Sequence, residues 1–217
     1  MSEDWLTRVA ELRRDYAGAP LDEDAVAPTW LAQFQRWMDD AIAAAVLEPN
    51  AMVVATAGAD GRPGARTVLL KGVDEGGFAF FTNLDSAKGR QVQENPQAAV
   101  VFPWLDLARQ VTATGAVEPV PAAESDAYFV SRPRAAQVSS LASPQSQVIA
   151  SRDELLRRRA EVEAAHPESV ARPPRWGGLR VVPDTVEFWQ GRPDRMHDRL
   201  RYRREPGGAW VVERLAP

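Results

Sequence analysis

The sequence predicts an α+β protein that is mainly β, with an antiparallel sheet or small barrel and flanking helices. Short apolar runs with strand-like alternation recur from residue 52 to residue 117, and tight-turn signals such as Asp60-Gly61 and Gly76-Gly77 separate them. Helical patterns lie on either side of these runs. Because further strand patterns occupy the C-terminal part, we expect strands from both parts to complete one barrel. Residues 1–217 are therefore predicted to form a single domain.

Two helices are predicted near the N-terminus. Ser2 is placed to cap a first helix that extends to about Tyr16, with Trp5, Val9 and Leu12 on one face. A loop rich in Gly, Pro and acidic residues follows over residues 17–28. Thr29 is placed to cap a second helix, whose apolar face is predicted to contain Trp30, Phe34, Trp37, Met38 and Ile42.

Alternating apolar positions bounded by Gly, Pro or Asn define the strands. They are predicted at residues 52–56, 66–71, 78–82, 98–102, 110–117, 178–182, 185–189, 199–203 and 210–215. Ser86 is placed to cap a short helix that ends near Asn95-Pro96, and residues 121–147 are expected to be helix and loop. Ser151 and Glu154 form a capping box before a helix to about Ala165, whose three consecutive arginines, Arg157, Arg158 and Arg159, indicate a solvated face.

Composition excludes several classes of function. The net charge of −4 argues against a general nucleic-acid binder. The absence of cysteine excludes disulfides and thiolate catalysis, and with only two histidines no metal site is expected. The N-terminal residues lack the pattern of a signal peptide, and no apolar run is long enough to span a bilayer. We therefore expect a cytoplasmic protein with no membrane partner.

Cations and amides at strand ends are the main chemical signal, because no dinucleotide-binding, Walker or nucleophile-elbow motif is present. Arg195, His197 and Arg199 alternate, so in an extended chain their side chains would share one face. Such a set suits a phosphate, which Arg binds with a bidentate fork and Lys with a point charge. Taken alone, such residues are more often exposed or structural than part of a binding or catalytic site, and spacing leaves the reaction open. The set comprises Arg66, Lys71, Lys88, Arg109, Gln110, Gln145, Ser146, Arg195, His197 and Arg199.

An ordered series of motifs over residues 12–217 resembles the pyridoxamine 5′-phosphate oxidase family. The motifs are Glu48-Pro49-Asn50-Ala51-Met52, Arg66-Thr67-Val68-Leu69-Leu70-Lys71, Phe81-Thr82-Asn83, Phe102-Pro103-Trp104, Arg109-Gln110-Val111, Ser131-Arg132-Pro133-Arg134, Trp176-Gly177-Gly178, Val186-Glu187-Phe188-Trp189-Gln190-Gly191, Arg195-Met196-His197-Asp198-Arg199 and Arg214-Leu215-Ala216-Pro217. The resemblance implies an FMN-binding split β-barrel with flanking helices. It also implies a homodimer with two FMN molecules at the interface, each contacted by both chains.

The resemblance also implies roles for individual residues. The FMN contacts would be Arg66, Thr67, Val68, Leu69, Leu70, Lys71, Phe81, Thr82, Lys88, Gln110, Gln145, Ser146, Trp189 and Arg199. The substrate contacts would be Arg13, Arg14, Asp15, Tyr16, Lys71, Tyr128, Arg132, Arg195, Met196 and His197. Residues 1–28 would form an N-terminal flap and helix. Arg195 and His197 would be the catalytic residues, which orient the substrate and hold or deprotonate its ring substituents.

The implied reaction is the oxidation of pyridoxine 5′-phosphate and pyridoxamine 5′-phosphate to pyridoxal 5′-phosphate, with O2 as acceptor and hydrogen peroxide as product. Two alternatives remain: a split-barrel flavin oxidase for another substrate, such as the phenazine-type oxidases, and a non-catalytic flavin- or haem-binding protein. Three positions depart from the family pattern. Ala87 and Ala136 replace an Arg and a Ser that contact phosphates, and Phe81 replaces a Tyr. Each lost hydrogen bond to a charged group would cost about 1.5–3 kcal/mol.

Overall fold

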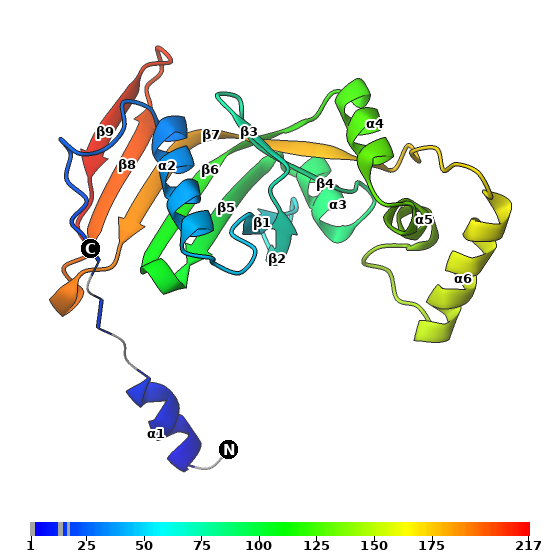
Figure 1. Cartoon of the computed structure of the whole chain (residues 1–217), viewed down its shortest axis with the longest axis horizontal. Coiled ribbons are helices and arrows are strands. Elements are labelled where there is room, and N and C mark those ends of the chain that lie inside the picture. The colour runs from blue at the N-terminus through cyan, green and yellow to red at the C-terminus, as the bar shows by residue number, and fades with distance from the viewer. Residues whose placement is uncertain (1–2, 13–14, 17) are drawn as a thin grey trace. The chain divides into compact units, whose positions relative to one another are not determined.

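The computed structural model describes residues 3–12, 15–16 and 18–217, which belong to two compact units (Figure 1). Unit 1 contains residues 1–49, 103–111 and 186–217, and unit 2 contains residues 50–102 and 112–185. Strands β5 (Gln97–Trp104), β6 (Arg109–Pro119) and β7 (Trp176–Gln190) contribute residues to both units.

The strands of unit 2 pair in a sheet of order β2-β1-β5-β6-β7-β4-β3. The first four strands are β1 (Ala51–Ala57), β2 (Pro63–Leu69), β3 (Gly72–Asp74) and β4 (Gly77–Asn83). The β1–β2 and β4–β7 pairs are antiparallel, with Val54 opposite Arg66 and Phe80 opposite Leu179. Alternate residues of β1 are buried, as expected for a strand with one face against a core. The predicted antiparallel sheet is thus confirmed, and β3 is a short strand that the sequence did not indicate.

Unit 2 contains the four helices α3 (Ala87–Glu94), α4 (Ala122–Ser131), α5 (Arg134–Ala142) and α6 (Arg152–Ala165). The first and the last of these begin at the side-chain caps that the sequence predicted. Ser86 Oγ accepts a hydrogen bond from the Gly89 N–H at the start of α3, and Ser151 Oγ accepts one from the Glu154 N–H at the start of α6. Of the three consecutive arginines on α6, Arg157 is exposed, whereas Arg158 is half-buried against Glu154 and Arg159 is also half-buried.

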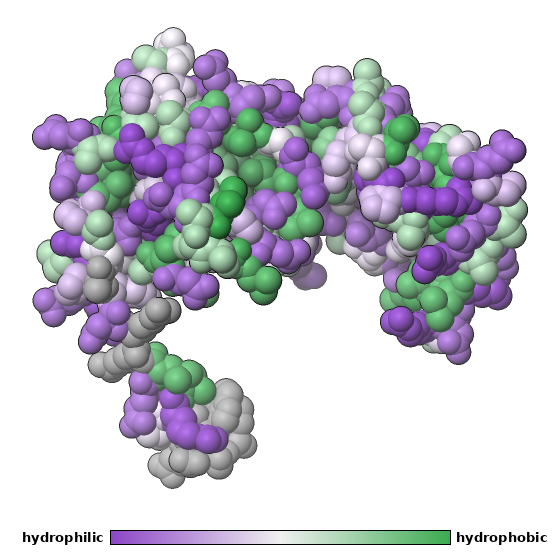
Figure 2. Space-filling model, viewed as in Figure 1, coloured by the Kyte–Doolittle hydropathy of each residue, from purple (hydrophilic) through white to green (hydrophobic). Residues whose placement is uncertain are grey.

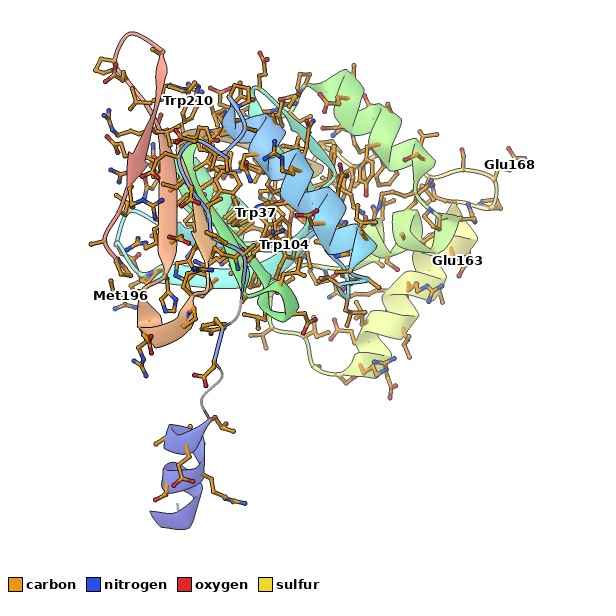
Figure 3. The ribbon with its side chains drawn as sticks, turned by 60° about the vertical axis from the view of Figure 1, so that its left-hand side comes forward. Trp37, Trp104, Glu163, Glu168, Met196 and Trp210 are labelled. Atoms are coloured by element: carbon orange, nitrogen blue, oxygen red, sulfur yellow. The ribbon has the colours of Figure 1, made fainter. Side chains whose placement is uncertain are left out.

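Unit 1 is organised around helix α2 (Trp30–Ala43), which Thr29 caps by accepting a hydrogen bond from the Ala32 N–H. Its aromatic residues pack on strand residues: Trp37 lies edge-on to Phe188 at 5.2 Å, and Phe34 is 6.0 Å from Trp104 (Figure 3). The predicted apolar face was wrong for Ile42, which is 58% exposed. The buried face of the helix does not include Ile42. It includes Gln33 instead, whose side chain accepts a hydrogen bond from the Ala27 N–H.

The remaining elements of unit 1 are α1 (Glu3–Glu11), the short 3-10 helices η1 (Leu105–Leu107) and η2 (Pro193–Arg195), β8 (Asp198–Arg204) and β9 (Trp210–Arg214). β8 pairs with β7 and β9, and the β8–β9 pair is antiparallel (Figure 1). The first helix ends at Glu11 rather than near Tyr16, because the Tyr16 ring packs edge-on against Trp189 and His197 instead of continuing a helix. Ser2, its predicted cap, lies outside the described residues.

Residues 178–189 form part of one continuous strand, β7, where the sequence predicted two. The prediction treated Pro183 as a break because proline has no N–H to donate to a neighbouring strand. The pairing of β7 with β4 covers residues 176–181 and therefore ends before Pro183. On the other side, Gly115 lies so close to the Val182 carbonyl that a Cβ at this glycine would be 2.0 Å from the oxygen. The strand thus continues through the proline.

The surface in view in Figure 2 is mostly hydrophilic, with hydrophobic residues in small groups. No helix of the part of the chain that the structure describes has the length and apolar character needed to cross a membrane.

A cluster of charged residues in unit 1 joins residues 21–23 to β8 and β9. Arg214 donates to both carboxylate oxygens of Glu23 at 2.6 Å and to Asp198 at 2.9 Å. It also donates to the Leu21 carbonyl, and Asp198 in turn accepts the Leu21 N–H. The hydrogen bonds from Arg214 hold the pKa of Glu23 at about 2, below its ordinary value of 4.5.

We expect this contact to give the protein an acid-sensitive contribution to stability. Because the folded-state pKa of Glu23 is lowered, the contribution is complete above about pH 4.5 and is lost as the pH falls toward 2. Thermal unfolding of the wild type and of Glu23→Gln at several pH values checks this. The variant should unfold at a lower temperature at pH 7, and the difference should shrink below pH 4.5. A difference that is constant from pH 7 to pH 2.5 would contradict the assignment.

Candidate functional site

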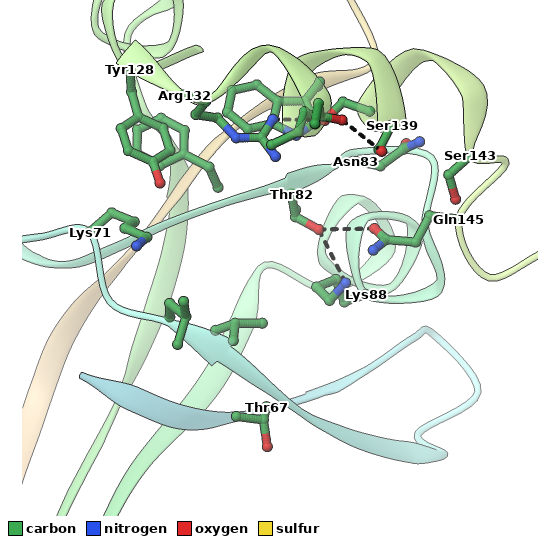
Figure 4. A pocket seen from close by; sticks show the side chains of 17 residues that line it. Thr67, Lys71, Thr82, Asn83, Lys88, Tyr128, Arg132, Ser139, Ser143 and Gln145 are labelled. Carbon is green, nitrogen blue, oxygen red and sulfur yellow. Dashed lines mark hydrogen bonds between the residues drawn. The ribbon is translucent and has the colours of Figure 1, made fainter. Parts of the chain in front are cut away.

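A cavity of about 770 Å³ lies in unit 2, bordered by β2, β4, α3, α4 and α5 (Figure 4). Its volume is in the range of small-molecule and cofactor sites. Polar and apolar side chains both line it. The lining residues are Thr67, Val68, Leu69, Lys71, Phe81, Thr82, Asn83, Lys88, Tyr128, Arg132, Ala135, Ala136, Ser139, Ser140, Ser143, Gln145 and Trp176.

Lys88 is a buried cation at one end of this cavity. It is 7% exposed, and its Nζ lies 3.1 Å from Thr82 Oγ1 and 3.5 Å from Ser86 Oγ. Burial lowers the pKa of Lys88, and the nearby charge of Arg66 lowers it further. No carboxylate within the described residues pairs with Lys88 or Arg66. Burying a charge without a counter-ion is unfavourable, so this end of the cavity is suited to an anionic ligand.

Arg66 lies beside the cavity rather than in its lining. Its guanidinium donates to Thr56 Oγ1 at 2.6 Å and to Gln91 Oε1 at 3.2 Å, and burial lowers its pKa. Thr82 links Lys88 to Gln145, which also lines the cavity. Its hydroxyl accepts a hydrogen bond from Lys88 and donates one to Gln145 at 3.3 Å (Figure 4). The neutral partners fix the two cations in place without neutralising them.

Arg132 is a second cationic centre of the cavity. Its guanidinium lies over the Trp176 ring, 4.8 Å from the ring centroid, and donates to Ser140 Oγ at 2.7 Å. Burial lowers the pKa of Arg132, with a smaller opposing effect from Tyr128. Lys71, in the link between β2 and β3, also lines the cavity. Within the described chain Arg132 has no carboxylate partner, so it too is available to an anion.

Three aromatic rings stack on one another beside Arg132 and form an aromatic wall. Phe81 stacks on Tyr128 at 4.2 Å and on Trp176 at 5.5 Å, with interplanar angles of 25° and 12°. Trp176 is fixed from behind by the buried cluster of Phe129, Val138 and Val170. Flat apolar surfaces next to cations are the chemistry expected for phosphorylated aromatic ligands.

The cavity brings together many of the residues that the sequence singled out. Arg66 and Leu70 neighbour the lining without joining it, and Ser146 is exposed with a positive φ of 69°. Those in the lining are Thr67, Val68, Leu69, Lys71, Phe81, Thr82, Lys88, Tyr128, Arg132 and Gln145.

The other predicted residues lie in unit 1, where three rings form a separate group. Tyr16 is 5.6 Å from both Trp189 and His197, and Trp189 is 4.7 Å from His197. His197 Nδ1 accepts the Arg192 N–H at 3.1 Å, which places the proton of the neutral imidazole on Nε2. This nitrogen is therefore a hydrogen-bond donor.

Arg199 is engaged by a carboxylate, unlike the cations of the cavity. It donates to both oxygens of Glu187 at 2.8 and 3.0 Å, and these bonds raise its pKa. Gln110 is half-buried at the start of β6, and Asp15 is exposed. Arg13 and Arg14 were predicted to contact the substrate but lie outside the described residues.

The predicted alternation of Arg195, His197 and Arg199 along an extended chain was wrong at Arg195. Pro193 begins the 3-10 helix η2, and Asp194 and Arg195 adopt positive φ angles of 54° and 59°. These left-handed residues reverse the chain, so the period-two rule of a strand does not apply. Arg195 is exposed, and Met196 is 68% exposed at the surface (Figure 3).

Several lining residues were missed by residue-level reasoning. Asn83 and Trp176 lie inside motifs that carried the family resemblance, so their position was a usable signal. The serines of α5 gave no signal, because residues 121–147 were predicted only as helix and loop, and no helix face could be assigned. Among the described residues, no group of three His, Asp or Glu side chains is placed to hold a metal ion.

Comparison with known proteins places the chain in a family. Residues 38–166 match the family model described as pyridoxamine 5′-phosphate oxidase, and residues 176–217 match that of the pyridoxine 5′-phosphate oxidase C-terminal dimerisation region. The chain is 50% identical over 212 residues to a pyridoxine/pyridoxamine 5′-phosphate oxidase of Cupriavidus necator, covering 98% of this chain and all of that protein. It is 52% identical over 214 residues to that of Burkholderia vietnamiensis, with the same coverage.

Solved structures agree with this result. The structure of PhzG from Burkholderia lata, in complex with tetrahydrophenazine-1-carboxylic acid, has a TM-score of 0.87 and 31% identity, and covers 94% of this chain and 100% of that one. A pyridoxamine 5′-phosphate oxidase-related, FMN binding protein from Nostoc punctiforme has a TM-score of 0.71 at 20% identity, covers 89% of this chain and 100% of that one, and supports the fold alone. The predicted fold class, an antiparallel split barrel with flanking helices, is confirmed. The chain belongs to the pyridoxamine 5′-phosphate oxidase family.

Proposed function

We propose that this protein uses FMN and O2 to oxidise pyridoxine 5′-phosphate and pyridoxamine 5′-phosphate to pyridoxal 5′-phosphate, with hydrogen peroxide as product. The oxidation of the amine also consumes water and releases ammonia. The observation that carries the proposal is the cavity of unit 2, in which Lys88 and Arg132 have only neutral partners among the described residues and an aromatic wall lies beside them. Two phosphorylated aromatic molecules are the ligands that such a cavity suits best.

The donor set fits FMN as the cofactor. Lys88 is buried with hydroxyl partners only, and Arg66 lies close enough to lower its pKa, so a phosphate would supply the missing negative charge. We assign to FMN the residues predicted from the family, including Thr82, Gln145, Gln110, Trp189 and Arg199. When bound, FMN supplies the hydride-accepting ring and transfers the electrons to oxygen.

The chain's own residues bind and orient the substrate in this proposal. Lys71, Tyr128 and Arg132 would hold the substrate phosphate, and the stacked rings of Phe81 and Trp176 would keep water from that end of the cavity. Arg195 and His197 would orient the reacting ring, His197 by donating from Nε2 because its Nδ1 is occupied. Positioning of this kind, rather than an acid–base pair, is what a flavin oxidase asks of its protein.

A homodimer is part of the proposal. Residues 176–217 match a dimerisation region, and this segment includes Trp189, Arg195, His197 and Arg199. We infer that two FMN sites lie at the subunit interface and that both chains contact each of them. Tyr16, which contacts Trp189 and His197, would belong to a flap over the site.

Anaerobic addition of pyridoxine 5′-phosphate to the purified protein tests the proposal. The protein should be yellow, the flavin absorbance near the visible maximum should disappear on addition, and it should return with peroxide when air is admitted. Arg195→Ala should retain FMN but lose absorbance at least about 100-fold more slowly, the loss expected when a group that orients the substrate is removed. A yellow protein whose absorbance is unchanged by the substrate would refute the proposed reaction.

A phenazine-type oxidase is the second candidate, favoured by the similarity to PhzG. The identity to the two pyridoxine/pyridoxamine phosphate oxidases is higher, at 50–52% against 31%. Arg132 and Lys71 also provide two cations for one phosphate dianion. Parallel assays with pyridoxine 5′-phosphate and with a reduced phenazine carboxylate separate the candidates, because the second substrate has no phosphate.

A further inference from the structure

The side chain of Arg132 is held by a specific set of contacts. Arg132 follows α4 in an extended conformation, with φ of −75° and ψ of 148°, and so begins the turn to α5. Trp176 and Phe129 lie under its guanidinium, 4.8 and 5.7 Å from the ring centroids. Its one side-chain hydrogen bond among the described contacts is the 2.7 Å bond to Ser140 Oγ. Ser140 thus sets the direction of a guanidinium that would otherwise be free to rotate over the rings.

The only proton of the Ser140 hydroxyl is already used within the protein. The hydroxyl donates this proton to the Ala136 carbonyl at 2.9 Å and accepts from Arg132. It has no second proton to offer a bound anion. Any effect of Ser140 on an anionic ligand must therefore act through the guanidinium of Arg132, which keeps its full charge because the hydroxyl is neutral.

Position 136 lies one helical turn before Ser140, so both residues belong to the same face of α5, and both line the cavity. The family pattern places at this position a serine that helps to hold the substrate phosphate, and here it is Ala136. We propose that Ser140 is a positioning residue for the phosphate end of the substrate. Its hydroxyl lies one turn further along α5 than position 136, fixes Arg132, and so replaces the hydroxyl that position 136 lacks. This inference rests on the proposed function.

The test compares two isosteric variants of the FMN-loaded protein. Ser140→Thr keeps the hydroxyl, and Ser140→Val has the same shape as Ser140→Thr but lacks the hydroxyl. Ser140→Ala also lacks the hydroxyl and has a smaller side chain. Ser131→Ala is the matched control, since Ser131 is exposed next to Arg132, donates to the Tyr128 carbonyl and lies outside the cavity lining. Calorimetric titration with inorganic phosphate and steady-state kinetics with pyridoxine 5′-phosphate are the two readouts.

We expect Ser140→Ala and Ser140→Val to weaken phosphate binding and to raise KM by about tenfold each, which corresponds to about 1.4 kcal/mol. The kcat should stay within about twofold, because Ser140 acts at the phosphate and not at the reacting carbon. Ser140→Thr and Ser131→Ala should match the wild type within about twofold in both readouts. A structural role alone would lower FMN content or melting temperature without this division between KM and kcat.

Two results would overturn the inference: phosphate affinity and KM that are unchanged in Ser140→Val, or a loss confined to kcat. Failure of the proposed function has a different signature. In that case the wild type would bind phosphate in a Ser140-dependent way, yet would not oxidise pyridoxine 5′-phosphate.

Discussion

Replacing Lys88 by Met should lower the affinity for FMN by about 100-fold and should make the FMN-free protein more stable. Hydrogen bonds to charged groups contribute about 1.5–3 kcal/mol, and the upper part of this range corresponds to about two orders of magnitude in affinity. The opposite effect on stability follows from burial. Lys88 is 7% exposed and its only described partners are neutral hydroxyls, so without an anion its charge opposes folding. Methionine keeps the length of the stem and removes the charge.

Arg90→Met is the matched control, because Arg90 is an exposed cation on the same helix and donates to the Asp85 carbonyl. Fluorescence titration of apoprotein with FMN measures the affinity, and chemical denaturation with and without FMN measures the stability. The control should change FMN affinity by less than about threefold, as expected for an exposed charge. If Lys88→Met binds FMN as tightly as the wild type, or if its apoprotein is less stable, Lys88 is not the phosphate-binding cation.

Local rules explain why the surroundings of Lys88 could be predicted from the sequence. A serine before a polar run, with strands on either side, predicts a helix start, and Ser86 caps α3 as predicted. The burial of Lys88 could not be predicted in the same way. It depends on Thr82 and Gln145, and Gln145 is 57 positions further along the chain than Lys88. Only the family resemblance, which implies FMN contacts for all three, brought these residues into one expectation.

Where the sequence rules failed, longer-range contacts or chain reversals were the cause. Period-two reasoning placed Arg195 on the face of His197, but Arg195 itself and the preceding Asp194 have positive φ. Pro183 was taken as the end of a strand, but the pairing with β4 had already ended at Val181, so its missing N–H removes no bond there. Likewise, the sequence indicated only that Ala136 lacks a hydrogen-bond donor. It could not predict that Ser140 contacts Arg132, because this contact depends on how the chain turns between α4 and α5.

Replacing Trp176 by Ala should cost about 3–5 kcal/mol of unfolding free energy, the largest stability effect that we expect from a residue of the cavity. Trp176 is 5% exposed and belongs to the buried cluster with Phe129, Val138 and Val170. Its removal would leave a void that this cluster cannot fill, since its ring also stacks on Phe81. Trp176→Phe keeps part of the ring and should cost less.

Trp210→Ala is a close control, because Trp210 also lies on a strand, has an aromatic neighbour in Trp30 at 6.3 Å and an arginine, Arg204, 5.1 Å from its ring centroid. It differs in being half-buried, so less apolar surface is lost when it is removed. Urea denaturation of FMN-free protein should therefore show a loss for Trp176→Ala at least about twice that for Trp210→Ala. Equal losses of unfolding free energy in the two variants would contradict this prediction. They would mean that the type of contact, and not the extent of burial, determines how much the Trp176 ring contributes to stability.

The same variants separate the two roles of Trp176. Its burial in the core cluster stabilises unit 2, and its face supports the guanidinium of Arg132 at 4.8 Å. Phenylalanine provides a smaller π-face, and cation–π attraction is strongest for Trp. Trp176→Phe should therefore weaken phosphate binding in FMN-loaded protein that remains folded, whereas Trp210→Phe should leave phosphate binding unchanged. If Trp176→Phe lowers stability but binds phosphate as the wild type does, then Ser140 alone fixes Arg132, and the aromatic wall serves only the core.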